Sequence, residues 1–194
     1  MKIFIYLILS ITFFSCFVNK NIIKKDGIFF YVSDDKIEKT RLRSTTSSEI
    51  KRLEKVRGSV YTYYLDFETF VSEDPFYQNY YLKIEYIGQG WDFINNDKLL
   101  IVCDGEKREF LVAKGSPIRY VIGADVVKEK LSWKCNEEDF RWIISAKEVI
   151  VRIYAEGGYI DTQVTEKGKV NYNKFYDTYI ISKDWLKEPY RESK

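Results

Sequence analysis

The stretch "SVYTYYLDFETF", residues 59–70, alternates large apolar side chains with more polar ones. One phase of this alternation holds Tyr61, Tyr63, Leu65 and Phe67. Successive side chains of a β-strand point to opposite faces of a sheet, so a period of two predicts a strand with one buried face and one solvated face. Asp66 and Glu68 occupy the other phase, and we expect them on the solvated face.

The segments around this stretch predict further antiparallel strands. In "YYLKIEYI", residues 80–87, Lys83 and Glu85 are expected to point outward, and the inward phase holds Leu82, Ile84 and Tyr86. Residues 99–103 are apolar throughout, as in a central strand. Asp104-Gly105 favours a type I′ turn, so the chain is expected to return over residues 106–112 as a hairpin.

Four more segments complete the predicted strands. Residues 27–32 predict a first strand. Residues 119–130 predict a strand pair or one bent strand. Gly157-Gly158 separates two alternating segments, 149–155 and 160–164, and predicts a second hairpin.

Helices are expected at three places. Asn136 precedes three acidic residues, which suits a helix start because the Asn side chain accepts a backbone N–H and the acids face the positive end of the helix dipole. Its apolar stripe would be Phe140, Ile143 and Ile144. Thr165 would cap a last helix that carries Tyr172, Phe175, Tyr176 and Tyr179.

The third expected helix lies in the polar, basic stretch 36–57, where Ser47 or Ser48 would cap a short helix with Ile50, Leu53 and Val56 on one face. The basic residues of this stretch suit either a solvated loop or a contact with anionic headgroups.

These patterns predict a fold that is mainly β with minor α. Seven to nine short strands, mostly joined by hairpins, favour an antiparallel β-sandwich-like domain with one helix between strands and a C-terminal helix. No change in composition divides the chain, so residues 27–194 are predicted to form a single β-rich domain.

The composition argues against several classes of site. The chain has no His, which removes Ser-His-Asp and Cys-His catalysis and the commonest ligand of transition metals. Gly88-Gln89-Gly90 lacks the third glycine of a phosphate-binding loop, and no acidic calcium loop is present. The formal net charge of +2 gives no field that would steer the chain to nucleic acid. We therefore expect no metal, no cofactor and no nucleic-acid partner.

The N-terminus reads as a secretory leader. Lys2 gives a positive start, and an apolar segment follows from Ile3. Counted through Val18, the segment is shorter than the roughly 17–25 residues that a membrane span requires. Phe13-Phe14-Ser15-Cys16 resembles the lipobox of bacterial lipoproteins, although Phe14 is larger than the residue usual at its position.

The resemblance implies that Cys16 is diacylglyceryl-modified on sulfur and becomes the new N-terminus. Residues 1–15 would then be a signal peptide and residues 16–26 a lipidated tether that holds the domain at a membrane. The open alternatives are an ordinary signal peptide and a short anchor with an incidental Cys. Of the other cysteines, Cys103 and Cys135 would be either one disulfide or two free thiols, and we favour free thiols because two cysteines make no framework.

Tyrosines supply a candidate binding surface. Tyr64, Tyr80, Tyr81 and Tyr159 are predicted on outward faces. Tyrosine is favoured in contact patches, so these four would bind a sugar or a partner protein. The alternative for the aromatic residues as a whole is packing in the core.

The sequence therefore favours a non-enzymatic, membrane-anchored lipoprotein of the cell envelope, on its periplasmic or surface face. Its partners would be the membrane, through lipid on Cys16, and an envelope protein. One alternative is a carboxylate-dependent envelope hydrolase that uses Asp66 and Glu68. Another is a surface module that binds an external ligand or host protein.

Overall fold

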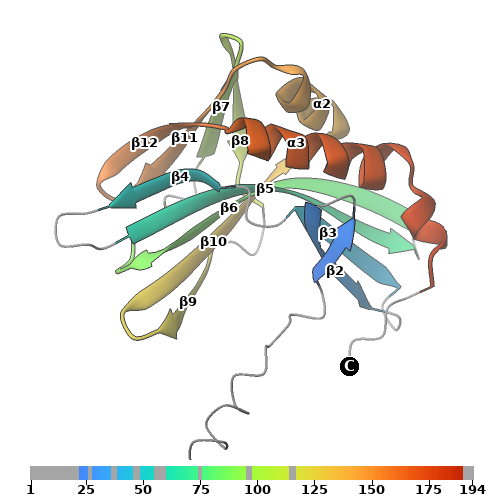
Figure 1. Ribbon diagram of the computed structural model, residues 1–194, viewed down its shortest axis with the longest axis horizontal. Helices are drawn as coiled ribbons and strands as arrows, with labels where there is room; N and C mark the ends of the chain where they lie inside the picture. The colour runs from blue at the N-terminus through green and yellow to red at the C-terminus, as the bar shows by residue number, and fades with distance from the viewer. Residues whose placement is uncertain are drawn as a thin grey trace, which may run out of the picture.

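Figure 1 shows a computed structural model of the chain. The structure describes residues 22–25, 28–35, 39–45, 49–54, 60–73, 76–94, 98–113 and 117–189. Cys16 and the predicted signal peptide lie outside these ranges, as do Ser47 and Ser48.

Most of the described residues belong to two antiparallel sheets. The larger sheet has the strand order β1-β2-β3-β5-β6-β10-β9, with β4 paired to β5 beside this path. Its strands are β1 (Ile22–Lys25), β2 (Ile28–Asp35), β3 (Thr40–Thr45), β4 (Glu49–Glu54), β5 (Val60–Glu73), β6 (Phe76–Gln89), β9 (Ile118–Gly123) and β10 (Val126–Cys135). The smaller sheet has the order β12-β11-β7-β8, from β7 (Lys98–Cys103), β8 (Glu106–Leu111), β11 (Val149–Ala155) and β12 (Gly158–Gln163).

One face of the larger sheet carries the core. The phase predicted to be buried in β5 is buried, because Tyr61, Tyr63, Leu65 and Phe67 are at most 5% exposed. Directly across the register, Phe67 faces Leu82 of β6, which in turn faces Trp133 of β10. The smaller sheet and the helices pack on this same face, and all of them share one hydrophobic cluster.

The predicted hairpins are confirmed. Asp104 and Gly105 have φ values of 48° and 88°, the left-handed conformation that a type I′ turn requires at both central positions. The Asp104 carboxylate also accepts hydrogen bonds from the backbone N–H of Lys147 and Glu148. Backbone hydrogen bonding thereby lowers the pKa of Asp104 and ties this turn to the start of β11. Residues 118–135 form a strand pair, β9 and β10.

Two of the predicted helices are confirmed, together with their caps. Helix α2 (Glu137–Ser145) begins with a capping box, in which the Asn136 side chain accepts from the Asp139 N–H and the Asp139 carboxylate accepts from the Asn136 N–H. Helix α3 (Glu166–Phe175) begins at Thr165, whose Oγ1 accepts from the Gly168 N–H at 3.1 Å.

Aromatic stacking holds both helices on the sheet. The Phe67 ring lies parallel to the rings of Phe140 from α2 and Tyr172 from α3, with centroids 4.3 and 4.2 Å apart. The Tyr172 hydroxyl also donates to the Leu65 carbonyl at 2.6 Å. The stripe of aromatic residues predicted for the last helix therefore faces the core.

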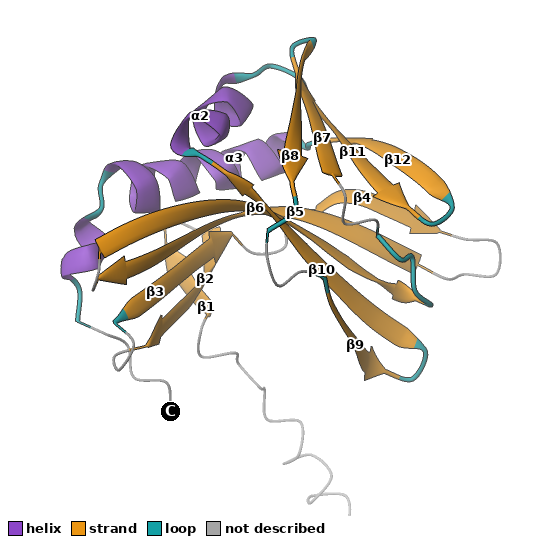
Figure 2. Cartoon of the chain, turned by 180° about the vertical axis from the view of Figure 1, so that it is seen from behind, coloured by secondary structure: helices purple, strands orange, loops and turns teal. Residues whose placement is uncertain are grey.

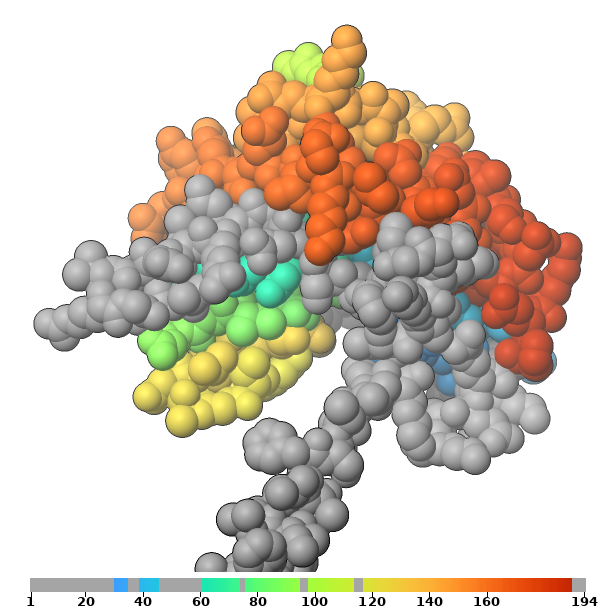
Figure 3. Space-filling view, in the orientation of Figure 1, coloured from blue at the N-terminus to red at the C-terminus, as the bar shows by residue number. Residues whose placement is uncertain are grey.

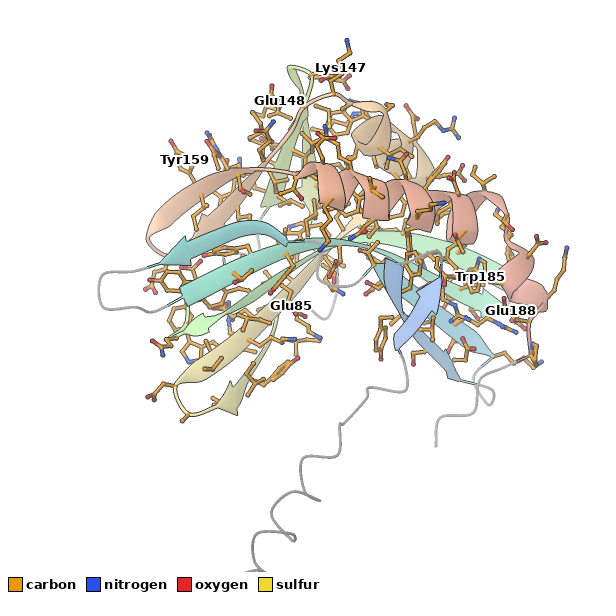
Figure 4. The ribbon with its side chains drawn as sticks, viewed as in Figure 1. Glu85, Lys147, Glu148, Tyr159, Trp185 and Glu188 are labelled. Atoms are coloured by element: carbon orange, nitrogen blue, oxygen red, sulfur yellow. The ribbon has the colours of Figure 1, made fainter. Side chains whose placement is uncertain are left out.

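The chain after α3 is held against the core side of β3. It continues through a π-helical segment, η1 (Tyr176–Ile181), to a short 3₁₀ helix, η2 (Asp184–Lys187). The Arg43 guanidinium lies over the Trp185 ring, 4.7 Å from its centroid, and pairs with Asp34 at 2.5 Å. Arg41 Nη1 donates to the Trp185 carbonyl, and Figure 4 shows Trp185 at this junction.

The short helix predicted within residues 36–57 is wrong. Residues 40–45 and 49–54 are the strands β3 and β4, both paired antiparallel to β5. Arg41 and Arg43 occupy the inward phase of β3, where the sequence suggested no buried face. Their charges are tolerated there because Asp34, Glu73 and the C-terminal segment supply partners from distant parts of the chain.

Two further observations concern the remaining predictions. Strand β1 lies within residues 16–26, which the sequence predicted as a tether, and it pairs with β2. Cys103 and Cys135 are both free, as favoured from the sequence, and burial raises the pKa of the Cys103 thiol to about 12.

The larger sheet curls strongly, which leaves it with a concave face opposite the core. In Figures 1 and 2, the β1–β3 end and the β9–β10 end both bend away from α3 on either side of β5 and β6. The result is an open half-barrel with helices on its convex side, so the predicted mainly β, antiparallel, sandwich-like class is confirmed.

Candidate functional site

The concave face of the larger sheet gathers charged side chains from β5, β6 and β10. The register places Asp66 opposite Lys83, Tyr64 opposite Glu85, and Glu85 opposite Lys130. Each belongs to the phase that points away from the core, and Figure 4 shows Glu85 on the side of the sheet away from α3. We call Asp66, Glu68, Lys83, Glu85, Lys128 and Lys130 the concave charge cluster.

Lys83 is the centre of one half of this cluster. Its Nζ lies 3.5 Å from Asp66 Oδ2 and 3.9 Å from Glu68 Oε2. It also donates to Ser44 Oγ on β3 at 3.0 Å. Thr45 Oγ1 donates to Asp66 Oδ1 and accepts from the Phe67 N–H, both at 2.9 Å. The side chains are therefore held by three strands at once.

Glu85 is the centre of the other half. Its two carboxylate oxygens accept ion pairs from different lysines, Lys128 at 2.8 Å and Lys130 at 3.4 Å. Lys130 also reaches Tyr120 on β9, where its Nζ lies 5.8 Å from the ring centroid. The contacts of the cluster thus extend across the curled sheet from β3 to β9.

These charges are recessed from solvent. The side chains of Asp66, Lys83, Glu85 and Glu68 are 5%, 14%, 15% and 17% exposed. The prediction of a solvated face is wrong at Asp66, because the residue as a whole is only 3% exposed. The curvature of the sheet explains the difference, since side chains on the inside of a bend crowd one another as those on a flat sheet do not.

Burial alters the acidity of the cluster. It raises the pKa of Glu68 above the ordinary glutamate value, with Lys83 opposing the shift and Asp66 adding to it. Burial lowers the pKa of Lys130, but Glu85 and Tyr120 outweigh this effect, so the net shift is upward. A carboxyl with raised pKa favours its protonated form in the folded state.

This shift predicts a pH-dependent effect of Glu68→Gln. Since the folded pKa exceeds the unfolded one, ionised Glu68 costs stability as pH rises from the ordinary glutamate value through the folded value. We expect the variant to gain stability relative to the wild type at about pH 7, and this gain to shrink at about pH 4. Thermal unfolding at both pH values measures it.

Glu109→Gln is the matched control for this prediction. Glu109 is exposed, and a hydrogen bond from Lys107 lowers its pKa, so its ionised form contributes stability at neutral pH. Glu109→Gln should therefore lose stability relative to the wild type at about pH 7, where Glu68→Gln gains it. If both variants changed the stability by the same amount and in the same direction, the raised pKa of Glu68 would be contradicted.

The four predicted tyrosines are not brought together. Tyr64 and Tyr81 lie in the concave phase of β5 and β6, where Tyr81 is opposite Glu68. Tyr80 points to the core side and packs edge-on against Phe140, with centroids 5.6 Å apart. Tyr159 lies on the smaller sheet beneath Arg152, far from Glu85 in Figure 4.

The sequence missed two kinds of residue at this site. Lys128 and Lys130 are in phase with Lys83 and Glu85, but only the pairing of β10 with β6 reveals it. Glu129, between them, points to the core side and is fully buried. It accepts from the N–H groups of Asp92, Phe93 and Ile94 and from Arg119, and so organises the loop after β6.

Positive and negative side chains are equal in number in the concave charge cluster. Three lysines and three carboxylates lie side by side, each carboxylate within 4 Å of an ammonium nitrogen. Tyr64, Tyr81 and Tyr120 border them, with hydroxyls that donate and accept. Such a surface suits a polar ligand that carries both signs of charge or many hydroxyl groups.

The described residues contain neither a candidate metal centre nor a candidate membrane-spanning helix. No group of three or more His, Cys, Asp or Glu side chains is placed to hold a metal ion. No helix within the described ranges has the length and hydropathy needed to cross a bilayer.

Comparison with known proteins gives no relative for this fold and site: no family model matches the chain, and no curated protein or solved structure matches it.

Proposed function

We propose that this chain is a membrane-anchored envelope lipoprotein whose domain binds a polar partner, without catalysis, on the concave face of its larger sheet. The observation that carries the proposal is the recessed, mutually paired concave charge cluster on a curved surface bordered by tyrosines.

The pairing supports a binding role because the polar groups are already held in place. Lys83 and Glu85 each have two or more partners on neighbouring strands, so little side-chain entropy remains to be lost when a ligand arrives. A partner that carries both signs of charge could replace some ion pairs within the cluster by ion pairs with its own groups. The charged side chains would then stay paired when water is removed, which limits the cost of desolvation.

The same pairing favours a non-catalytic role. A general base or nucleophile acts through a group free to accept a proton or attack, whereas Asp66 and Glu68 share one ammonium and Glu85 accepts from two. The cluster is therefore better suited to hold a ligand than to transform it.

Site-specific photo-crosslinking in the native envelope tests the binding face. A benzoylphenylalanine at position 81 would lie beside Glu68, and one at position 159 would replace an exposed tyrosine of the smaller sheet. We expect a discrete adduct from position 81 that is lost with Glu85→Gln, and none from position 159. The absence of an adduct at position 81, or the same adduct from both positions, would argue against this face.

The mass of the adduct and the conditions under which it forms distinguish an envelope protein from an external ligand. An envelope protein partner is the expected result. An adduct that forms only when medium or host material is added would instead favour the surface module for an external ligand.

The anchor is a separate part of the proposal and rests on the lipobox-like residues up to Cys16. We expect Cys16→Ser to abolish incorporation of radiolabelled fatty acid, with Cys103→Ser as the control that retains it. Equal incorporation into the Cys16 variant would remove the lipid anchor from the account and leave the binding face untouched.

A carboxylate hydrolase remains the second candidate, because a general acid needs a pKa above the ordinary carboxyl value and burial raises the pKa of Glu68 beside Asp66. Hydrolysis of envelope glycan by the purified chain, abolished in both Glu68→Gln and Asp66→Asn, would favour this candidate. We expect no release of sugar by any of the three chains.

A further inference from the structure

Strand β9 ends the larger sheet with an apolar edge. All six of its residues, Ile118–Gly123, are exposed, and no described strand pairs on its outer side. Ile118, Val121 and Ile122 are 55%, 65% and 48% exposed. Figure 3 shows the yellow atoms of β9 and β10 at the lower left margin of the molecule. An exposed edge strand with apolar side chains offers its unpaired N–H and C=O groups as a template for pairing with another strand.

The smaller sheet shows how this chain protects another edge. Strand β8 also ends a sheet, but it carries Glu106, Lys107, Arg108 and Glu109 in succession. Charges on an edge strand oppose pairing with another chain, and this is how monomeric proteins avoid edge-to-edge association. Strand β9 has no Lys, Glu, Asp or Pro.

The single charge of β9 is neutralised within the molecule. Arg119 Nε donates to Glu129 Oε2 at 2.9 Å, and Glu129 is fully buried. The same guanidinium lies 5.6 Å from the centroid of the exposed Phe93 ring, which neighbours Trp91. The edge is thus electrically neutral and flanked by aromatic surface, so a neutral, apolar strand complements it best.

We propose that β9 pairs antiparallel with β9 of a second copy of this chain, so that the two larger sheets become one continuous sheet. In such a pair, facing residues point to the same side of the sheet, which allows a two-fold axis at Tyr120 or at Val121. With the axis at Tyr120, Arg119 faces Val121 and Ile118 faces Ile122. With the axis at Val121, Arg119 faces Gly123. Neither arrangement opposes two like charges.

The proposal is independent of the proposed function, because it uses the edge of the sheet and not the charge cluster. It does join the two concave faces, since Tyr120 pairs with Lys128 in the register and belongs to the concave phase.

Val121→Lys tests the pairing, with Val170→Lys as the matched control on the exposed face of α3. The lysine introduced at 121 would face Arg119 or its own symmetry copy, depending on the axis, and in either case it would place an unpaired charge on an otherwise neutral edge. For the full chain in detergent, sedimentation should show dimers of the wild type and of the control. The dissociation constant of Val121→Lys should be about threefold to tenfold weaker.

Three results of these measurements on the protein without lipid would overturn the proposal. These are a monomeric wild type, a Val121→Lys chain that dimerises like the wild type, and a dimer whose β9 amide hydrogens exchange at the same rate at low and high protein concentration. If Val121→Lys fails to fold, amide hydrogen exchange of the wild-type chain still tests the pairing. Protection of the β9 amides that rises with protein concentration supports it. Protection that appears only with lipid vesicles would assign the edge to a membrane surface and overturn the dimer.

Discussion

Replacing Phe67 by alanine is expected to lower the free energy of unfolding by about 3–5 kcal/mol. Phe67 is fully buried, and its ring stacks between Phe140 and Tyr172, with interplanar angles of 8° and 3°. The substitution would remove the contact that both helices share with the sheet and leave a cavity among rigid rings. Denaturant unfolding of the two chains measures the difference.

Phe76→Ala is the control for this prediction. Phe76 belongs to the same sheet but is 64% exposed, so its loss should cost less than about 1 kcal/mol. If the Phe67 variant lost no more stability than the Phe76 variant, the stacked rings would not be the centre of the core.

Replacing Glu129 by alanine is expected to cost about 3–5 kcal/mol, although the substituted residue is charged. Its carboxylate accepts from the N–H groups of Asp92, Phe93 and Ile94 at 2.7, 2.9 and 3.2 Å, and from Arg119 at 2.9 Å. Alanine would leave all four donors without their acceptor, and the penalty would be greatest at the buried N–H of Ile94. Denaturant unfolding again gives the cost.

Glu156→Ala, at the exposed turn between β11 and β12, should change stability by no more than about 0.5 kcal/mol. The loop of Asp92–Ile94 also reports on Glu129 directly. Its amide hydrogens should exchange faster in the Glu129 variant and at the wild-type rate in the control. Unchanged exchange in that loop would mean that Glu129 does not organise it.

Much of the fold could be predicted from local patterns. Period-two alternation identified β5 and β6, the Asp104-Gly105 pair identified a hairpin, and Asn136 and Thr165 identified two helix starts. These features depend on residues close together in the chain. Their physical causes, side-chain direction, turn conformation and capping, are therefore readable in a short window of sequence.

The features that the sequence did not predict depend on distant partners. Arg41 and Arg43 made residues 40–45 look like a solvated loop, because their partners Glu73, Asp34 and Trp185 lie elsewhere in the chain. Glu129 interrupts the alternation of polar and apolar residues in β10, because a charged residue stands at a position that points to the core. Its burial could not be predicted, since its hydrogen-bond donors come from the loop after β6.

The sequence predicted the face on which the candidate site lies, but not its burial. Lys83, Glu85, Asp66 and Glu68 were assigned to the face away from the core, and they lie there. Their burial could not be predicted, because it depends on the curl of a sheet whose neighbouring strands come from distant parts of the chain. The tyrosine surface was partly misplaced, since Tyr80 points to the core side and Tyr159 lies on the other sheet.

The binding function depends on the concave face being a recessed surface with its charges held in place, and titration of the Glu68 carboxyl carbon by NMR tests this most directly. A pKa above the ordinary glutamate value is predicted, and it should rise further in Lys83→Met, because Lys83 opposes the effect of burial. A Glu68 that titrates at the ordinary value, with or without Lys83, would show a solvated strand face and contradict the account.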